Sequence, residues 1–205
     1  MTLVPLGDGG LLVYSPTWLG RDTFEQVEAI GTPRVLLAPN HFHHMSLTRF
    51  RERYPDAVAV ASKQAMPRLE RKGHVGVAHV GSVSLPDGMR FIECPHTRAG
   101  EVWVSYPSAE GRGWIVGDAF FHVNERIAGV MGAVLRLTHT TPGLCIGQTF
   151  RWIGLSDESG YRHWLLERLD TERPRTMQFS HGTPIEGDDL YTRLRALSER
   201  RLRGG

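Results

Sequence analysis

Histidine is the residue type whose number and placement most suggest chemistry in this sequence. Ten of the 205 residues are histidines, and three of them occur in the short segment His41-Phe42-His43-His44. In an extended segment, side chains two residues apart point to the same side, so His41 and His43 are expected to bind one metal ion while His44 points away. The same residues would also fit a loop in which the imidazoles hydrogen-bond to the backbone.

Three further segments place a histidine or an aspartate next to Gly or Pro, directly after an apolar run that is typical of a β-strand. They are Pro95-His96, Gly117-Asp118 and His181-Gly182. Each one alone is explained as well by a polar turn, and Asp118 as well by a helix cap. Together with the histidine segment, they give four apolar strands that end on side chains able to bind a metal. Ligand sites lie at such strand ends in open sheets, so the pattern predicts a metal site at a sheet edge.

The elements that would position these side chains follow from the hydrophobic pattern. An opening hairpin is expected at 2–6 and 11–14, followed by alternating strands and helices: strands at 35–38 and 57–61, helices at 22–30, 47–54 and 62–72. Short strands are expected at 83–85, 91–94, 101–106 and 114–116. A mixed, mainly helical region then follows Asp118, with helices at 158–169 and 187–201 around a strand at 176–179. Strands and helices mixed in this way predict sheets with helices packed outside them.

The order of these motifs resembles that of the metallo-β-lactamase fold superfamily. That superfamily has an H-x-H-x-D-H motif, then a histidine in a Pro-Gly-His-Thr-like turn, then Gly-Asp and a late His-Gly. The counterparts here begin at His41, His96, Asp118 and His181. The resemblance implies an α/β fold, namely a four-layer αββα sandwich of two mixed β-sheets with helices on the outer faces. It implies that residues 1–205 form a single domain of this kind.

The resemblance also implies a set of ligands. By correspondence with the family, His41, His43 and His96 bind a first metal, with Asp118 beside it, and His181 is what remains of a second site. A three-histidine site with an open fourth position suits tetrahedral Zn²⁺, with iron as the alternative, and lowers the pKa of bound water to about 7. Asp118 would ligate the metal or orient the water, and His181 would act as a base or bind substrate, so both are also expected to be catalytic.

The sequence departs from the family pattern within the first motif. Met45 and Ser46 stand where the family has the Asp and His of the second metal site. We therefore expect one metal ion per chain rather than two, and His44 is a candidate substitute for a lost ligand. The implied function is a metal-dependent hydrolase acting on an ester-, amide- or phosphoester-type substrate. The same departure also fits a domain of this fold that has lost catalysis and serves as a binding or interaction module.

Composition narrows the possible partners and reaction types. Lys and Arg number 24 against 22 Asp and Glu, so a net charge of +2 gives no field that would recruit nucleic acid or an anionic membrane. Cys94 and Cys145 are too few for a disulfide framework, and no G-x-S-x-G motif supports a serine hydrolase. The N-terminal segment lacks the basic region of a signal peptide. We expect a cytoplasmic protein with a small-molecule substrate and no nucleic-acid or membrane partner, with a homodimer left open.

Overall fold

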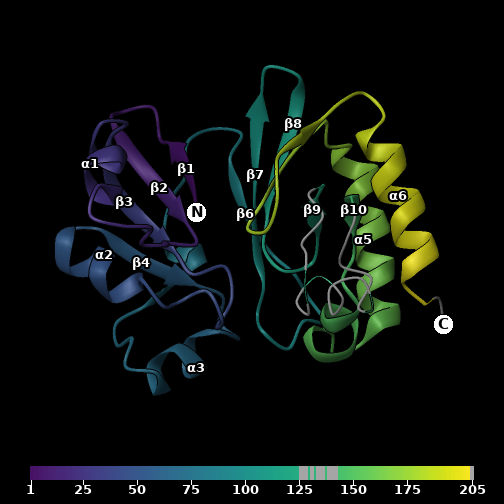
Figure 1. Ribbon diagram of the computed structural model, residues 1–205, viewed down its shortest axis with the longest axis horizontal. Coiled ribbons are helices and arrows are strands. Elements are labelled where there is room, and N and C mark those ends of the chain that lie inside the picture. The colour runs from purple at the N-terminus through teal and green to yellow at the C-terminus, as the bar shows by residue number, and fades with distance from the viewer. Residues whose placement is uncertain (125–128, 130–131, 133–136, 138–142, 204–205) are drawn as a thin grey trace. The chain divides into compact units, whose positions relative to one another are not determined.

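The computed structural model describes residues 1–124, 129, 132, 137 and 143–203. The chain forms two compact units: unit 1 comprises Met1–Phe91 with Ala99–Val102, and unit 2 comprises Ile92–Arg98 with Trp103–Gly205. The strands form two mixed five-stranded sheets and one small two-stranded sheet, and helices accompany both five-stranded sheets (Figure 1). The predicted α/β class with two mixed sheets is therefore confirmed.

The first sheet belongs to unit 1 and has the strand order β1-β2-β3-β4-β5. β1 and β2 pair antiparallel as the predicted hairpin, whereas β2 to β5 are parallel to one another. The strands are β1 (Thr2–Pro5), β2 (Gly10–Tyr14), β3 (Thr32–Leu37), β4 (Val58–Ala61) and β5 (Ala78–His79). The helices are α1 (Thr23–Glu28), α2 (Leu47–Arg53) and α3 (Met66–Arg71), followed by a 3₁₀ turn at Val80–Ser82.

Helices α1 to α3 bury their apolar faces against one face of this sheet. Leu36 and Ala61 from the sheet share a cluster with Phe50 of α2 and Leu69 of α3. These side chains are fully buried, so removing them from water is the main stabilising contribution to unit 1. This packing holds the loops that follow β3 and α3.

The second five-stranded sheet has the order β12-β11-β8-β7-β6. β8 pairs antiparallel with β7 and parallel with β11, and β11 pairs antiparallel with β12. The elements of this part of the chain are β6 (Arg90–Glu93), β7 (Val102–Ser108), β8 (Gly111–Val116), β9 (Phe121–Val123), β10 (Gly143–Cys145), a π-helical turn (Phe150–Gly154), α5 (Glu158–Glu172), β11 (Thr176–Phe179), β12 (Ile185–Glu186) and α6 (Leu190–Arg201).

Helix α5, expected from the sequence at 158–169, packs its apolar face into the core of unit 2. Tyr161, Leu165 and Leu169 are fully buried and cluster with Trp103 and Trp114 of the sheet. The last residue of α5 brings a carboxylate into this apolar region. Glu172 accepts hydrogen bonds from the Ser105 hydroxyl at 2.5 Å and from the Trp114 indole N–H at 2.8 Å. The carboxylate thereby pairs the polar groups of two sheet strands with the end of the helix.

Two sequence predictions differ from the structure. No strand forms at 83–85, because the chain makes the 3₁₀ turn Val80–Ser82 and then runs irregularly into the turn at Pro86. The described part of the region after Asp118 is mixed and mainly helical, as expected, but it also contains the short strands β9 and β10, which pair with each other and which the pattern did not predict. Strands of three residues depend on a partner distant in sequence, which a local hydrophobic pattern does not reveal.

None of the described helices has both the length and the apolar character needed to cross a membrane.

A buried histidine links α3 to the rest of unit 1. His74 is 6% exposed, and its Nε2 lies 2.9 Å from Nδ1 of His44, while its Nδ1 lies 3.5 Å from the Thr48 hydroxyl. Burial lowers the pKa of His74, and the positive charges of Arg51 and Lys72 lower it further. His74 is therefore held in the neutral form.

Replacement of Glu172 tests its role in unit 2. Glu172→Ala leaves two buried donors without their acceptor and is expected to lower the free energy of unfolding by about 3 kcal/mol. Chemical denaturation measures this loss. The matched control is Glu167→Ala, an exposed glutamate on the same helix, which should change stability by no more than about 0.5 kcal/mol. Equal effects of the two substitutions would contradict the assignment.

The buried neutral state of His74 makes stability depend on pH. Its pKa in the folded chain lies below the value of about 6.5 expected for the unfolded chain, so the unfolded chain takes up a proton first as pH falls. The stability contributed by His74 is present above about pH 6.5 and is lost below it. His74→Gln should therefore flatten the fall of the free energy of unfolding between pH 7 and pH 5, relative to an exposed control, His163→Gln. Urea denaturation at several pH values checks this, and parallel curves for parent and variant would contradict it.

Candidate metal centre

The histidine segment follows β3 as a compact turn, so the extended conformation expected for it is wrong. The cause is Asn40, a fully buried residue whose side-chain oxygen accepts the backbone N–H groups of Phe42 at 2.8 Å and His43 at 3.3 Å. Asparagine side chains commonly bend the backbone in this way. The Pro39-Asn40 dipeptide was a signal for this turn in the sequence.

The ring of His41 is oriented by a backbone carbonyl. Nδ1 lies 3.1 Å from the carbonyl oxygen of Ala99, which can only accept, and 3.3 Å from Nη1 of Arg68, which can only donate. The shorter contact favours the tautomer with the proton on Nδ1 and the lone pair on Nε2. Metal-binding histidines commonly donate their second ring nitrogen to such an acceptor. Arg68 donates toward Nε2 at 3.4 Å, so a metal ion on this nitrogen would displace the guanidinium.

His43 is oriented by a hydroxyl at the end of β2. The Ser15 hydroxyl lies 2.7 Å from Nδ1 of His43, and both groups belong to unit 1. Ser15 is buried and has a φ of 55°, a left-handed conformation that costs a non-glycine residue about 1 kcal/mol or more. Such strain is often found at functional sites, where the surrounding structure enforces a side-chain position.

His96 follows β6 in the predicted turn and also has a left-handed backbone, with a φ of 59°. Its carbonyl accepts the backbone N–H of Ser156 at 2.8 Å, which ties the turn to the start of α5. Nδ1 of His96 lies 3.4 Å from a carboxylate oxygen of Asp157, the residue that also caps α5. A carboxylate on Nδ1 favours the tautomer whose Nε2 carries the lone pair.

Asp118 and His181 are brought together by the pairing of two parallel strands. Val116 of β8 is aligned with Phe179 of β11, so the residues two positions beyond each strand end emerge side by side. Nε2 of His181 lies 3.1 Å from a carboxylate oxygen of Asp118. The expectation that strand ends gather these side chains is confirmed for this pair.

Sequence reasoning overlooked His122, which supports the turn that carries His181. The backbone N–H of His122 donates to the carbonyl of His181, and the carbonyl of His122 accepts the N–H of Thr183 at 2.9 Å. Its Nδ1 also donates to the carbonyl of Thr183 at 2.8 Å. Gly182 passes so close to the His122 carbonyl that a Cβ would lie 2.1 Å from the oxygen, so only glycine fits there. The contact joins segments about sixty residues apart, and no local pattern marked it.

The residues at the departure from the family pattern take other roles. Met45 is 87% exposed, and the Ser46 hydroxyl accepts the backbone N–H of Trp18 at 2.9 Å. Both ring nitrogens of His44 are hydrogen-bonded, one to Lys72 and one to His74. His44 therefore has no ring nitrogen left to replace a lost ligand.

The cysteines give no sign of thiol chemistry. Cys94 is buried and belongs to the core of unit 2. Burial raises the pKa of the Cys145 thiol to about 11, so it is protonated at neutral pH. A protonated thiol is a poor nucleophile and a poor metal ligand.

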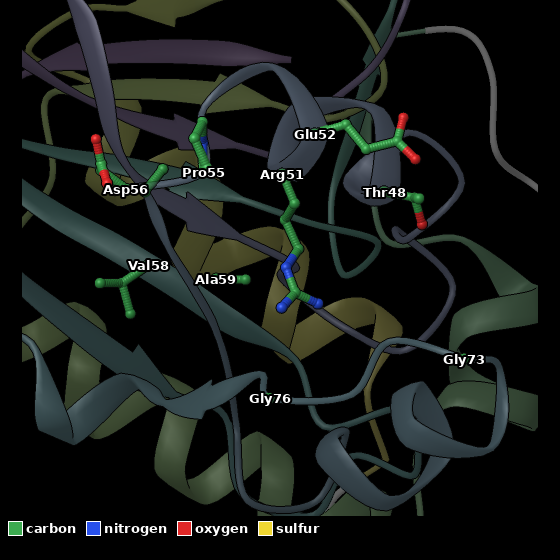
Figure 2. Close-up of a pocket in the computed structure, with 10 residues that line it drawn as sticks. Thr48, Arg51, Glu52, Pro55, Asp56, Val58, Ala59, Gly73 and Gly76 are labelled. Atoms are coloured by element: carbon green, nitrogen blue, oxygen red, sulfur yellow. The ribbon is translucent and has the colours of Figure 1, made fainter.

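Unit 1 has an open pocket of about 570 Å³ beside the C-terminal end of α2. Figure 2 shows Arg51 extending into this pocket toward Gly76, with Glu52 and Asp56 on its walls. Arg51 donates to the carbonyl of Val75 at 2.7 Å, which fixes the guanidinium against the pocket wall. None of the predicted site residues lines this pocket, so it is separate from the candidate metal ligands.

Comparison with known proteins identifies the fold. No protein-family model and no curated protein matches the sequence. Among solved structures, a metallo-β-lactamase from Pontibacter korlensis is 13% identical, with a TM-score of 0.59 over 97% of this chain and 86% of its own. The metallo-β-lactamase FIM-1 from Pseudomonas aeruginosa, in its mono-zinc form, is 14% identical with a TM-score of 0.58 over 97% and 82%.

A protein of different chemistry shares the same architecture. Rubredoxin oxygen:oxidoreductase from Desulfovibrio gigas is 14% identical, with a TM-score of 0.65 over 97% of this chain and 52% of its own. Hydrolytic and redox proteins are thus among the structural neighbours, and fold alone does not choose between their activities. The arrangement of strands and helices nevertheless agrees with the motif order found in the sequence, and the chain has the metallo-β-lactamase fold.

Proposed function

We propose that this protein is a metal-dependent hydrolase that binds one metal ion through His41, His43 and His96, with Asp118 and His181 completing the site. The observation that carries the proposal is the common state of the three histidines. In each of them Nδ1 faces an oxygen, from Ala99, Ser15 and Asp157 respectively. The Ala99 carbonyl and the Asp157 carboxylate can only accept, which favours a lone pair on Nε2 of His41 and His96, and the Ser15 hydroxyl orients the ring of His43. Imidazoles oriented in this way fit Zn²⁺, and an iron ion is the alternative.

The residues that stand in place of the Asp and His of the family motif, Met45 and Ser46, favour a single metal ion. An exposed methionine and a serine engaged with Trp18 provide no second set of ligands at residues 45 and 46. FIM-1, which has the same fold, exists in a mono-zinc form. One metal ion is also sufficient for hydrolysis in several families of zinc enzymes.

The Asp118–His181 pair supplies the acid–base part of the proposed mechanism. A bound zinc ion supplies Lewis acidity, which activates water at neutral pH. Asp118 accepts a hydrogen bond from Nε2–H of His181, so Nδ1 of His181 carries the lone pair and can take a proton from an attacking water. Phe121 lies against the His181 ring, 5.4 Å between centroids at 14°, and restricts its rotation. The proposed substrate is a small ester, amide or phosphoester.

The loss of the second ligand set supports a second candidate, a metallo-β-lactamase-like domain that binds a partner without catalysis. The two candidates differ in metal content and in turnover. A chain that stays metal-free when zinc is supplied favours the binding module. A chain that binds zinc and hydrolyses a chromogenic ester, lactone, thioester or phosphodiester supports the enzyme.

Metal analysis tests the ligand assignment directly. Protein purified without chelator should contain about one zinc or iron per chain by mass spectrometry. The double variant His41→Ala/His43→Ala should lose this metal, because it removes two of three proposed ligands. The control His163→Ala, which removes an exposed histidine of α5, should retain it. Equal metal content in the double variant and the parent would refute the assignment.

A substitution at Asp157 separates the orientation of His96 from the capping of α5. Asp157 accepts the N–H of Gly160 at 3.0 Å with one oxygen and faces His96 with the other. Serine is an equally good N-cap, so Asp157→Ser should keep thermal stability while weakening zinc affinity by about tenfold. Competition with a zinc chelator measures the affinity. Unchanged zinc affinity in Asp157→Ser would show that the carboxylate does not act through His96.

A further inference from the structure

Lys72 is one of only two lysines among the 24 basic residues of the chain. It follows the last residue of α3, and its side chain is held against the loop that carries the histidine segment. Nζ lies 2.9 Å from Nε2 of His44 and 3.3 Å from the carbonyl oxygen of His41. An exposed lysine is usually free to move, whereas this one is fixed at two points.

The direction of each hydrogen bond in this network follows from Lys72. An ammonium group can only donate, so His44 accepts at Nε2 and carries its own proton at Nδ1. That Nδ1–H donates to Nε2 of His74 at 2.9 Å, and Nδ1 of His74 donates in turn to the Thr48 hydroxyl at 3.5 Å. The donors therefore run one way, from Lys72 to Thr48. Burial and the charge of Lys72 lower the pKa of His44, which agrees with a neutral ring.

The network positions the charge of Lys72 without neutralising it. Both acceptors of the ammonium are uncharged, and no ion pair joins Lys72 to a carboxylate within the described residues. Two of its three N–H donors are engaged, and the third has no protein acceptor in that part of the chain. Arg68 adds a second cation one helical turn earlier, with Nη1 3.4 Å from Nε2 of His41. A fixed ammonium with a remaining donor is suited to a charge-assisted hydrogen bond with an oxyanion.

We propose that Lys72 binds the phosphate or carboxylate group of a small molecule beside the histidine segment, with Arg68 adding positive charge. The ligand is a small anion, because two cations on one short helix give too small a basic surface for a nucleic acid. If the bound anion is part of the substrate, the proposal rests on the proposed hydrolase function and implies that the substrate is anionic. The binding of an anion by Lys72 does not depend on that function, because it is inferred only from contacts within unit 1.

The small number of lysines allows a direct test. Protein labelled with ¹³C at lysine Cε gives two lysine signals, which Lys63→Arg assigns. Metal-free protein is titrated with inorganic phosphate and separately with acetate, at an ionic strength kept constant with sodium chloride. The Lys72 signal should shift and saturate with at least one of the two anions, while Lys63 serves as the internal control. The anion that saturates it identifies the ligand group as phosphate or carboxylate.

Variants supply an independent measurement through backbone amide shifts at residues 41–44. Lys72→Met should raise the concentration of anion needed for half-saturation by about tenfold, and Lys63→Met should leave it unchanged. The proposal is overturned if neither anion moves the Lys72 signal, or if both lysine signals move together without saturating. The titration is then repeated with zinc-loaded protein, so that anion binding by Lys72 and metal binding by the proposed hydrolase are tested separately. Saturable binding in a chain that takes up no zinc would refute the hydrolase and leave the anion site standing.

Discussion

The parallel pairing of β8 with β11 is the constraint on which the candidate chemistry of unit 2 depends. The alignment of Val116 with Phe179 brings the chain out of both strands at the same edge, which places Asp118 within hydrogen-bonding distance of His181. A shift of one residue in this register would turn each side chain to the opposite face of the sheet. The buried strands and the apolar face of α5 fix the register, so the core positions the polar pair.

Orientation of imidazole rings is the second recurring feature, and it is achieved by different means. A backbone carbonyl orients His41, a hydroxyl orients His43 and a carboxylate faces His96. Two of these arrangements involve left-handed backbone at a non-glycine residue, Ser15 and His96. The conformational cost is offset by the surrounding packing and hydrogen bonds, and the result is a set of histidines with restricted ring positions.

A polar network of Lys72, His44, His74 and Thr48 supports the loop after β3. His44 and His74 stay neutral because they are partly or fully buried and lie close to positive charge. His44 accepts from Lys72 and donates to His74, so the two histidines join the lysine to α2 through Thr48. The loop in which the sequence departs from the H-x-H-x-D-H pattern thus holds a lysine ammonium between His44 and the His41 carbonyl.

The sequence by itself determined where the buried strands β3, β8 and β11 end, because continuous apolar runs followed by Gly, Pro or polar residues mark buried strands locally. It thereby predicted that Asp118 and His181 follow strand ends, and it also predicted the opening hairpin and the helix α5. Tertiary structure decided the β9–β10 pair and the contacts of His122 and Lys72. Each of these depends on hydrogen bonds whose direction or partner is set by packing, often between residues far apart in the chain. A hydrogen bond needs both position and orientation, and composition and periodicity specify neither.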